Sequence, residues 1–134
     1  MHRDDLGMVE RGDMFWNRGL GNVLVKALAP VLFQFRHSGR FSPDLFIEDG
    51  YVLAEYGASL KVVHLLGHAR GSIGLLTDKG ELFCGDLLIN EKKPVLNYRI
   101  ADAAAARSSV ERLRSLHVTI VFPSPAANSK WMIS

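Results

Sequence analysis

The chain has 134 residues, of which 48% are hydrophobic and 22% are charged, and its formal net charge at pH 7 is +2. This length fits one small domain with a modest core. So small a charge, with the Lys and Arg residues scattered along the chain, argues against nucleic acid or an anionic membrane as a partner.

The first part of the chain reads as helical. Residues 1–13 have the pattern of a short polar helix, in which Asp4 and Asp5 near the start favour the helix dipole. A more apolar helix is expected over residues 22–35, divided by Pro30. The expected topology therefore begins with two helices.

The middle of the chain reads as strands joined by tight turns. Apolar runs separated by glycine-containing turns are typical of antiparallel hairpins. The expected strands cover residues 44–48, 51–55, 60–66, 72–77 and 81–84.

The last part combines one clear helix with irregular chain. The expected elements are a loop over residues 90–97, a helix over 101–116, a strand over 118–122 and a loose tail over 124–134. The helix is the clearest of these because Val110, Leu113 and Leu116 recur at helical spacing. Together the elements predict an α/β fold, in which helices cover one face of a mostly antiparallel sheet.

A histidine and an aspartate each follow the end of an expected strand. His68 lies in the sequence G-H-A-R-G-S, whose glycines allow a sharp turn, and Asp86 follows Gly85 directly after the next strand pair. An imidazole and a carboxylate held at strand ends are suitable as one half of a zinc site. A capping or core role for His68 and a helix N-cap role for Asp86 are the alternatives.

The stretch from His64 to Leu88 reads H-L-L-G-H-A-R-G-S-I-G-L-L-T-D-K-G-E-L-F-C-G-D-L-L. It resembles the C-terminal half of metallo-β-lactamase-superfamily hydrolases, including the glyoxalase II-like branch, in which a P-G-H-T-x-G-S turn and a hairpin precede L-F-x-G-D. The resemblance covers about residues 1–123 and leaves residues 124–134 as a tail outside the family pattern. It implies half of an αββα sandwich.

The resemblance also implies a metal centre and a reaction. By it, His68 is a metal ligand and Asp86 is the carboxylate that bridges two metal ions, with Zn²⁺ as the expected cofactor. Relatives of this kind hydrolyse esters, thioesters or lactones with a metal-activated water. His64 matches a position that is not normally a ligand.

Two parts of the family pattern are absent from the sequence. No H-x-H-x-D-H motif is present, and the chain reads Val121-Phe-Pro123 where a final histidine would follow. Catalytic zinc sites usually have at least three protein ligands, so two should hold zinc weakly. We therefore expect a truncated hydrolase of this superfamily that is inactive or weakly active by itself; a non-catalytic interaction module is the alternative.

The remaining histidines and charged residues have ordinary interpretations. His2, His37 and His117 are expected to be surface or helix-end histidines. Asp4 and Asp5 are expected to be solvated at a helix start, and a ligand-like cluster is the alternative. Arg70 either contacts an anionic substrate or is solvated.

The single cysteine, Cys84, excludes an intramolecular disulfide and is expected to be buried and structural. With a polar N-terminus that lacks a secretory signal, this indicates a cytoplasmic protein without a membrane partner. A lone half-sandwich would expose one sheet face, so we expect self-association or pairing with an N-terminal half-domain. The candidate residues near that face are Val62, Leu75, Leu82 and Leu87.

Overall fold

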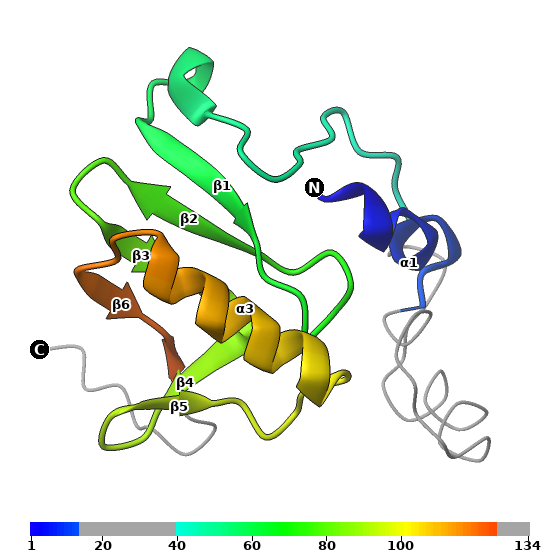
Figure 1. Ribbon diagram of the computed structural model, residues 1–134. Helices are drawn as coiled ribbons and strands as arrows, with labels where there is room; N and C mark the ends of the chain where they lie inside the picture. The colour runs from blue at the N-terminus through cyan, green and yellow to red at the C-terminus, as the bar shows by residue number, and fades with distance from the viewer. Residues whose placement is uncertain (14–39, 126–134) are drawn as a thin grey trace, which may run out of the picture.

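The computed structural model of the chain describes residues 1–13 and 40–125 (Figure 1). The apolar helix expected over residues 22–35 and His37 lie outside the described residues. The described elements form a mixed α/β fold whose larger sheet is mainly antiparallel, as the sequence predicts.

The N-terminal segment is helical, but it is shorter than expected and divided. The 3-10 helix η1 covers Arg3–Asp5 and the α-helix α1 covers Leu6–Arg11. Gly12 ends α1 in the left-handed conformation at φ 66°, which glycine adopts without a steric penalty.

Neither of the first two expected strands forms. Residues 44–48 contain no strand, because the backbone groups of Leu45 and Ile47 bond to the amino group and the carbonyl of Met1 at 2.8 and 2.9 Å. Part of the second expected strand is the 3-10 helix η3, Leu53–Tyr56, which Gly57 ends at φ 77°. The first segment therefore bonds to the N-terminus and not to a sheet, and the second keeps only an isolated bridge between Val52 and Lys61 of the strand that follows.

The larger sheet has the strand order β1-β2-β3-β6. Its strands are β1 (Leu60–His64), β2 (Ile73–Thr77), β3 (Glu81–Phe83) and β6 (Ile120–Phe122). The first three pair in antiparallel fashion, and β6 pairs with β3 in parallel. The hairpins expected from the sequence are thus confirmed, with bounds one or two residues shorter.

The smaller sheet has the order β5-β4-β7 and was not expected. Its strands are β4 (Leu88–Asn90), β5 (Pro94–Leu96) and β7 (Ser124–Pro125). The segment expected as a loop over residues 90–97 is therefore largely a hairpin. The first two residues of the expected tail pair with β4 in parallel, and residues 126–134 lie outside the described part of the chain.

Helix α3, Ala103–Ser115, covers one face of the larger sheet (Figure 1). Its Ala106 and Leu113 lie in the same buried cluster as Val63, Leu65 and Leu82 of the sheet side. Asp102 caps the helix, because its Oδ1 accepts hydrogen bonds from two backbone amides of the first turn at 3.0 and 2.9 Å. The amphipathic helix expected from the sequence is confirmed.

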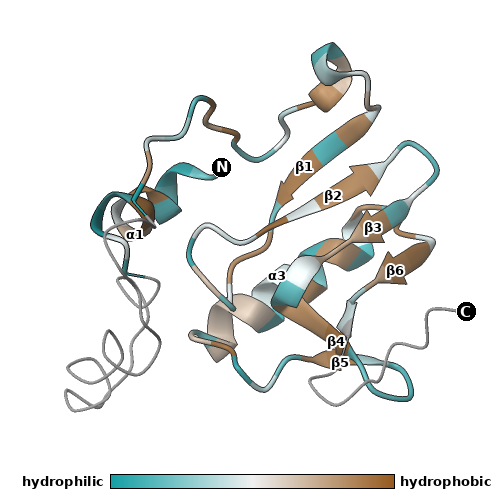
Figure 2. Ribbon diagram, turned by 180° about the vertical axis from the view of Figure 1, so that it is seen from behind, coloured by the Kyte–Doolittle hydropathy of each residue, from teal (hydrophilic) through white to brown (hydrophobic). Residues whose placement is uncertain are grey.

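The opposite face of the larger sheet carries exposed aromatic residues. Figure 2, which views the molecule from behind, shows that β3 and β6 are largely hydrophobic. Phe83 and Phe122 are 46% and 44% exposed and stack with ring centroids 4.8 Å apart, and Ile120 on the same strand as Phe122 is 50% exposed. We call these three residues the aromatic patch.

Two of the four residues expected near an exposed sheet face lie on the face opposite to α3. Val62 is the register partner of Leu75, and Leu75 is that of Phe83, so their side chains share this face. Val62, Leu82 and Leu87 are at most 1% exposed, and Leu75 is half-buried. Leu82 and Leu87 belong to the core beneath α3. The strand alternation explains the error for β3, since Phe83 lies on the face opposite to Leu82. In residues 1–13 and 40–125, no helix has the length and hydropathy needed to cross a membrane.

Candidate metal centre

His68 lies in the turn that joins β1 to β2, and this turn is packed against α3. Gly67 has φ 143°, and a Cβ added there would lie 2.6 Å from the Cβ of Ala106 in α3. Its carbonyl accepts the backbone N–H groups of Ala101 and Asp102 at 2.9 and 3.0 Å. Only glycine permits this close approach, so the residue before His68 fixes the turn against the start of the helix.

The other end of the same turn is packed against the N-terminal segment. The Gly71 amide donates a hydrogen bond to Asp5 Oδ1 at 3.0 Å, and a Cβ at Gly71 would lie 2.3 Å from the Asp5 carboxyl carbon. Ser72 closes the turn by accepting the Ala69 amide at 2.9 Å. Close packing thus explains why both positions in the G-H-A-R-G-S sequence are glycine, and the hydrogen bond to Ala69 explains the serine.

Asp86 lies in the short 3-10 helix η4, Gly85–Leu87, which follows β3. Gly85 enters it at φ 53°, and Leu87 anchors it in the core at 1% exposed. The Asn97 side-chain amide donates to the Asp86 carbonyl at 2.9 Å. The backbone of Asp86 is therefore held from both sides while its carboxylate remains 54% exposed.

The two ligands implied by the family resemblance lie side by side. His68 Nε2 is 3.6 Å from Asp86 Oδ2, and the His68 side chain is 15% exposed. Ligands of one tetrahedral ion at bond lengths near 2.1 Å lie about 3.4 Å apart, so the pair has the spacing of two ligands on one ion. Among residues 1–13 and 40–125, no third His, Cys, Asp or Glu completes a metal group with this pair.

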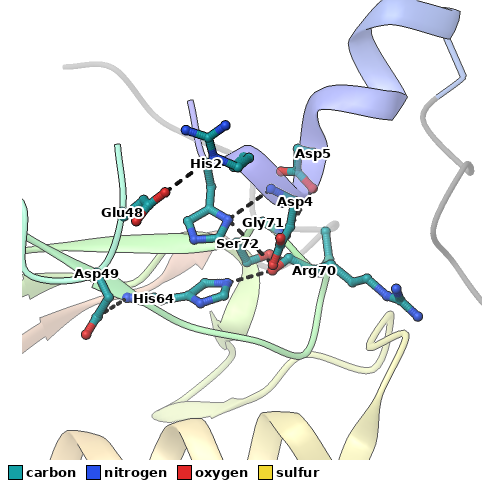
Figure 3. A network of polar contacts seen from close by, with 11 residues as sticks. His2, Asp4, Asp5, Glu48, Asp49, His64, Arg70, Gly71 and Ser72 are labelled. Atoms are coloured by element: carbon teal, nitrogen blue, oxygen red, sulfur yellow. Dashed lines mark hydrogen bonds and ion pairs between the residues drawn. The ribbon is translucent and has the colours of Figure 1, made fainter. Parts of the chain in front are cut away.

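A second group of metal-ligating side chains was not expected from the sequence. His2, Asp4 and His64 each offer one ligand atom, and these atoms lie within 4.8 Å of one another. Figure 3 shows the two imidazole rings one above the other, with the Asp4 carboxylate beside them. The ring centroids are 3.9 Å apart and the planes are inclined by 22°.

His2 is not the surface histidine that the sequence suggested. Its side chain is only 9% exposed, and Nδ1 accepts the Asp4 amide at 3.2 Å, so it caps η1. Burial, and next the charge of the neighbouring His64, lower the pKa of His2 below its ordinary value. Asp4 is half-exposed, at 51%, but it is not simply a solvated carboxylate at a helix start.

His64 ends β1 and is held by polar contacts on both its backbone and its ring. Its Nε2 lies 2.6 Å from the Arg70 carbonyl oxygen, and its amide donates to Asp49 Oδ1 at 2.8 Å. Asp49 also pairs with Arg112 of α3 at 2.6 Å. The hydrogen bond from Arg112 is the main reason why the pKa of Asp49 is lowered.

No sequence signal connects His2 with His64. His2 is near the N-terminus and His64 is 62 residues later in the chain. Neither residue belongs to a motif with metal-ligand spacing. The one useful signal is the alternation of β1, which places Val62 and His64 on the same face. The alternation does not show which distant side chain would contact His64 on that face.

A cavity of about 300 Å³ is bordered by Asp4 of the second group and by Gly67 and Ala69 on either side of His68, but His68 and Asp86 do not line it. Its lining consists of Asp4, Leu66, Gly67, Ala69, Arg70, Ala101, Asp102 and Ala105. Arg70 is exposed and lines the cavity with a positive charge. This position is compatible with both expected roles, contact with an anionic substrate and solvation.

Cys84 and His117 were also singled out in the sequence. Cys84 is the N-cap residue of η4, two positions before Asp86, whereas His117 lies apart from this region. Cys84 is 1% exposed, and burial raises the pKa of its thiol, so it is the structural cysteine that the sequence predicts. His117 is exposed and follows α3 at φ 50°, and its carbonyl is close to Gly80 beside the far end of β2.

Comparison with known proteins gives similarity in structure alone. No protein-family model and no curated protein matches the sequence. TTHA1623, solved in a di-iron-bound form, has a TM-score of 0.59 and 26% identity, over 92% of this chain and 55% of its own. The metallo-β-lactamase family protein TTHA1429 from Thermus thermophilus has a TM-score of 0.61 and 19% identity, over 92% of this chain and 44% of its own.

The chain thus spans about half the length of these two solved structures, 55% of one and 44% of the other. The matched part includes nearly all of this chain, and the mixed α/β architecture agrees. The chain therefore shares its fold with part of a metallo-β-lactamase family protein.

Proposed function

We propose that this chain supplies part of the metal centre of a metallo-β-lactamase-superfamily hydrolase, with His68 and Asp86 as ligands. The observation that carries the proposal is the distance of 3.6 Å between His68 Nε2 and Asp86 Oδ2. These two atoms come from separate turns at the ends of β1 and β3, and the fold similarity supports the same interpretation.

The donor set and its support fit a transition-metal ion. One imidazole and one carboxylate suit zinc and iron alike, and we propose Zn²⁺ as the resident ion. Both ligands stand on backbone that is fixed by glycine contacts and by the core. Ligands held in this way lose little conformational entropy when they bind an ion.

A bound ion would supply Lewis-acid activation of water or of a substrate carbonyl. The chain's own residues would orient that ion and the substrate: His68 and Asp86 by ligation, and Arg70 by its positive charge at the cavity beside the turn. The substrate class that we propose is an ester, a thioester or a lactone.

Two ligands are too few for a tightly held catalytic ion, because such sites usually have three protein ligands. We therefore propose that the described residues form half of an αββα sandwich and that further ligands come from a second half-domain. The chain alone should bind metal weakly at His68 and Asp86 and hydrolyse its substrates slowly. The free, buried Cys84 fits a reducing compartment, and we propose a cytoplasmic location.

The test is metal binding at His68 and Asp86. Zinc titrations by calorimetry on the EDTA-treated chain should show a weak site that His68→Gln and Asp86→Asn each remove. The matched control is His117→Gln, which changes an exposed histidine away from the pair. An unchanged titration profile in both variants would overturn the assignment of these residues.

A second candidate function is favoured by the aromatic patch. Phe83 and Phe122 alternate with Leu82 and Val121, which pack in the core beneath α3, so the exposed pair lies on the opposite face of the sheet. Such a surface is typical of an interface. On this interpretation the chain is a non-catalytic module that binds another chain through the patch. Loss of partner binding on substitution of the patch, with no metal at His68, would favour it.

A further inference from the structure

We infer that His2, Asp4 and His64 form a second, separate binding site for a divalent transition-metal ion such as Zn²⁺. None of these residues is among the ligands implied by the family resemblance. The ligand atoms of the three side chains lie within 4.8 Å of one another, and they come from η1 and from the end of β1 (Figure 3).

The spacing is close to that of a loaded site. His2 Nδ1 and Asp4 Oδ2 are 3.7 Å apart, against about 3.4 Å for two ligands of a tetrahedral ion. The third atom, on His64, lies within 4.8 Å of the other two, so a shift of at most about 1.4 Å brings it to the same geometry. Side-chain rotation supplies shifts of this size without movement of the strand.

The lone pair of His2 Nδ1 is directed at the backbone amide of Asp4 and must be released from it to bind an ion. Nδ1 accepts the Asp4 amide at 3.2 Å, so this nitrogen carries no proton and is the acceptor of the ring. Since that hydrogen bond is long, its exchange for a metal bond costs little. The deprotonated nitrogen is the form that binds a metal ion.

His64 is oriented by its surroundings in the manner of a metal ligand. The Arg70 carbonyl contacts His64 Nε2 at 2.6 Å, and a ligating histidine typically donates its second ring N–H to a carbonyl or a carboxylate. The His64 backbone is fixed in β1 and by Asp49 at 2.8 Å. The His64 ring is therefore held in place beside His2 and Asp4 (Figure 3).

The N-terminal segment that carries the other two ligands is also held independently of any ion. The Met1 amino group donates to the Leu45 carbonyl at 2.8 Å, and the Gly71 amide donates to Asp5 at 3.0 Å. His2 and Asp4 are thus placed against β1 before an ion arrives. Loading an ion therefore requires rotation of side chains but no movement of the segment, which keeps the entropy cost of binding low.

The chemistry of the donor set selects the class of ion. Two imidazoles and one carboxylate favour Zn²⁺, Co²⁺, Ni²⁺ or Fe²⁺ over Mg²⁺ and Ca²⁺, which prefer oxygen ligands. Asp4 is 51% exposed and borders the cavity of about 300 Å³, so water has access to complete the coordination. The ion would join the N-terminal segment to the sheet.

The stacked rings give the site a diagnostic response. An ion that lies in the plane of both imidazoles cannot be bound while the planes remain stacked at 3.9 Å with an inclination of 22°. One ring must tilt on loading. The side-chain resonances of His2 and His64 should therefore shift together on zinc titration, whereas those of His117 should not.

The experiment is calorimetric titration of Zn²⁺ into the EDTA-treated full chain, followed by NMR of the histidine ring protons. We expect one ion per chain at this site and a loss of affinity of at least about tenfold in His64→Gln and in Asp4→Asn. His117→Gln should bind as the wild type does. Asp4→Asn changes a half-exposed side chain, so it tests the site even if His64→Gln folds poorly.

A double variant separates this site from the one at His68. In His68→Gln/Asp86→Asn, the binding that depends on His64 should remain. Zinc binding that is abolished by the double variant and unaffected by Asp4→Asn and His64→Gln would overturn the inference and leave the proposed function intact. Binding that follows Asp4 and His64 alone would support the inference and count against the proposed ligands His68 and Asp86.

Discussion

At the scale of single residues, two glycines decide where the candidate ligand His68 lies. Gly67 allows contact with α3 and Gly71 allows contact with Asp5, so the turn is held between a helix and the N-terminal segment. The sequence predicted the turn and both His68 and Asp86, because their signals are local. It missed the group of His2, Asp4 and His64, because that group depends on a contact between distant segments.

Substitution of Gly67 tests how strongly the turn depends on this packing. Gly67→Ala should lower the free energy of unfolding by about 3 kcal/mol, since the new Cβ meets Ala106 and the backbone has φ 143°. The measurement is urea denaturation followed by circular dichroism. Gly57→Ala is the matched control, because Gly57 has φ 77° but nothing within 4 Å of an added Cβ.

The control variant should lose only about 1 kcal/mol, the cost of the left-handed backbone for alanine. Equal losses in the two variants would mean that backbone conformation, and not the approach of α3, makes glycine necessary in the turn.

At the scale of elements, the hairpins and α3 could be predicted because their patterns are regular and self-contained. The expected strand over residues 44–48 was wrong because its backbone partners come from Met1. The β4–β5 hairpin was missed because Pro94 and the lysines before it read as a loop. Elements whose hydrogen-bond partners lie far away in the sequence therefore could not be predicted from local patterns.

The cap of α3 gives a direct test at this scale. Asp102→Ala removes an acceptor of two backbone amides, at 3.0 and 2.9 Å, and should lower the free energy of unfolding by about 1 kcal/mol. Asp102→Asn should restore most of the loss, because asparagine is an equally good cap. Thermal and urea denaturation of the three proteins measure both changes.

The ion pair between Asp49 and Arg112 makes the contact of α3 with β1 sensitive to acid. The pKa of Asp49 is lowered below 3.8 in the folded chain, so its contribution to stability is present above that pH. It is lost as the pH falls through the lowered pKa, because the unfolded state then binds the proton more readily.

Asp49→Asn should therefore be less stable than the wild type at about pH 6, and this difference should shrink below pH 3.8. Urea midpoints of metal-free wild type and variant across this range measure it. Asp44→Asn is the control, because Asp44 is an exposed carboxylate. A constant difference at all pH values would show that the Asp49 side chain acts by packing and not by its charge.

At the scale of the whole molecule, one sheet face is covered by α3 and the other carries the aromatic patch. The sequence predicted the covering helix and an exposed face. It placed Val62 and Leu75 on that face correctly, but it also assigned Leu82 and Leu87 to it, and these two lie in the core beneath α3. The choice of face depends on strand register, and a change of one residue reverses it. The aromatic patch is the surface from which self-association is expected.

We predict that association decreases when the patch is made polar. Phe83→Ser/Phe122→Ser should weaken self-association, or binding to a separate half-domain, at least about tenfold. Sedimentation velocity over a range of concentrations measures the change. Tyr98→Ser is the control, since Tyr98 is 63% exposed and lies after β5, outside the patch.

The parallel pairings of the two sheets have a consequence for synthesis of the chain. β6 pairs with β3, and β7 pairs with β4, across the whole of α3. During translation, β3 and β4 therefore leave the ribosome well before the strands that will cover their edges. For that interval the nascent chain presents two unpaired strand edges, which are sites where chaperones bind or where neighbouring nascent chains aggregate.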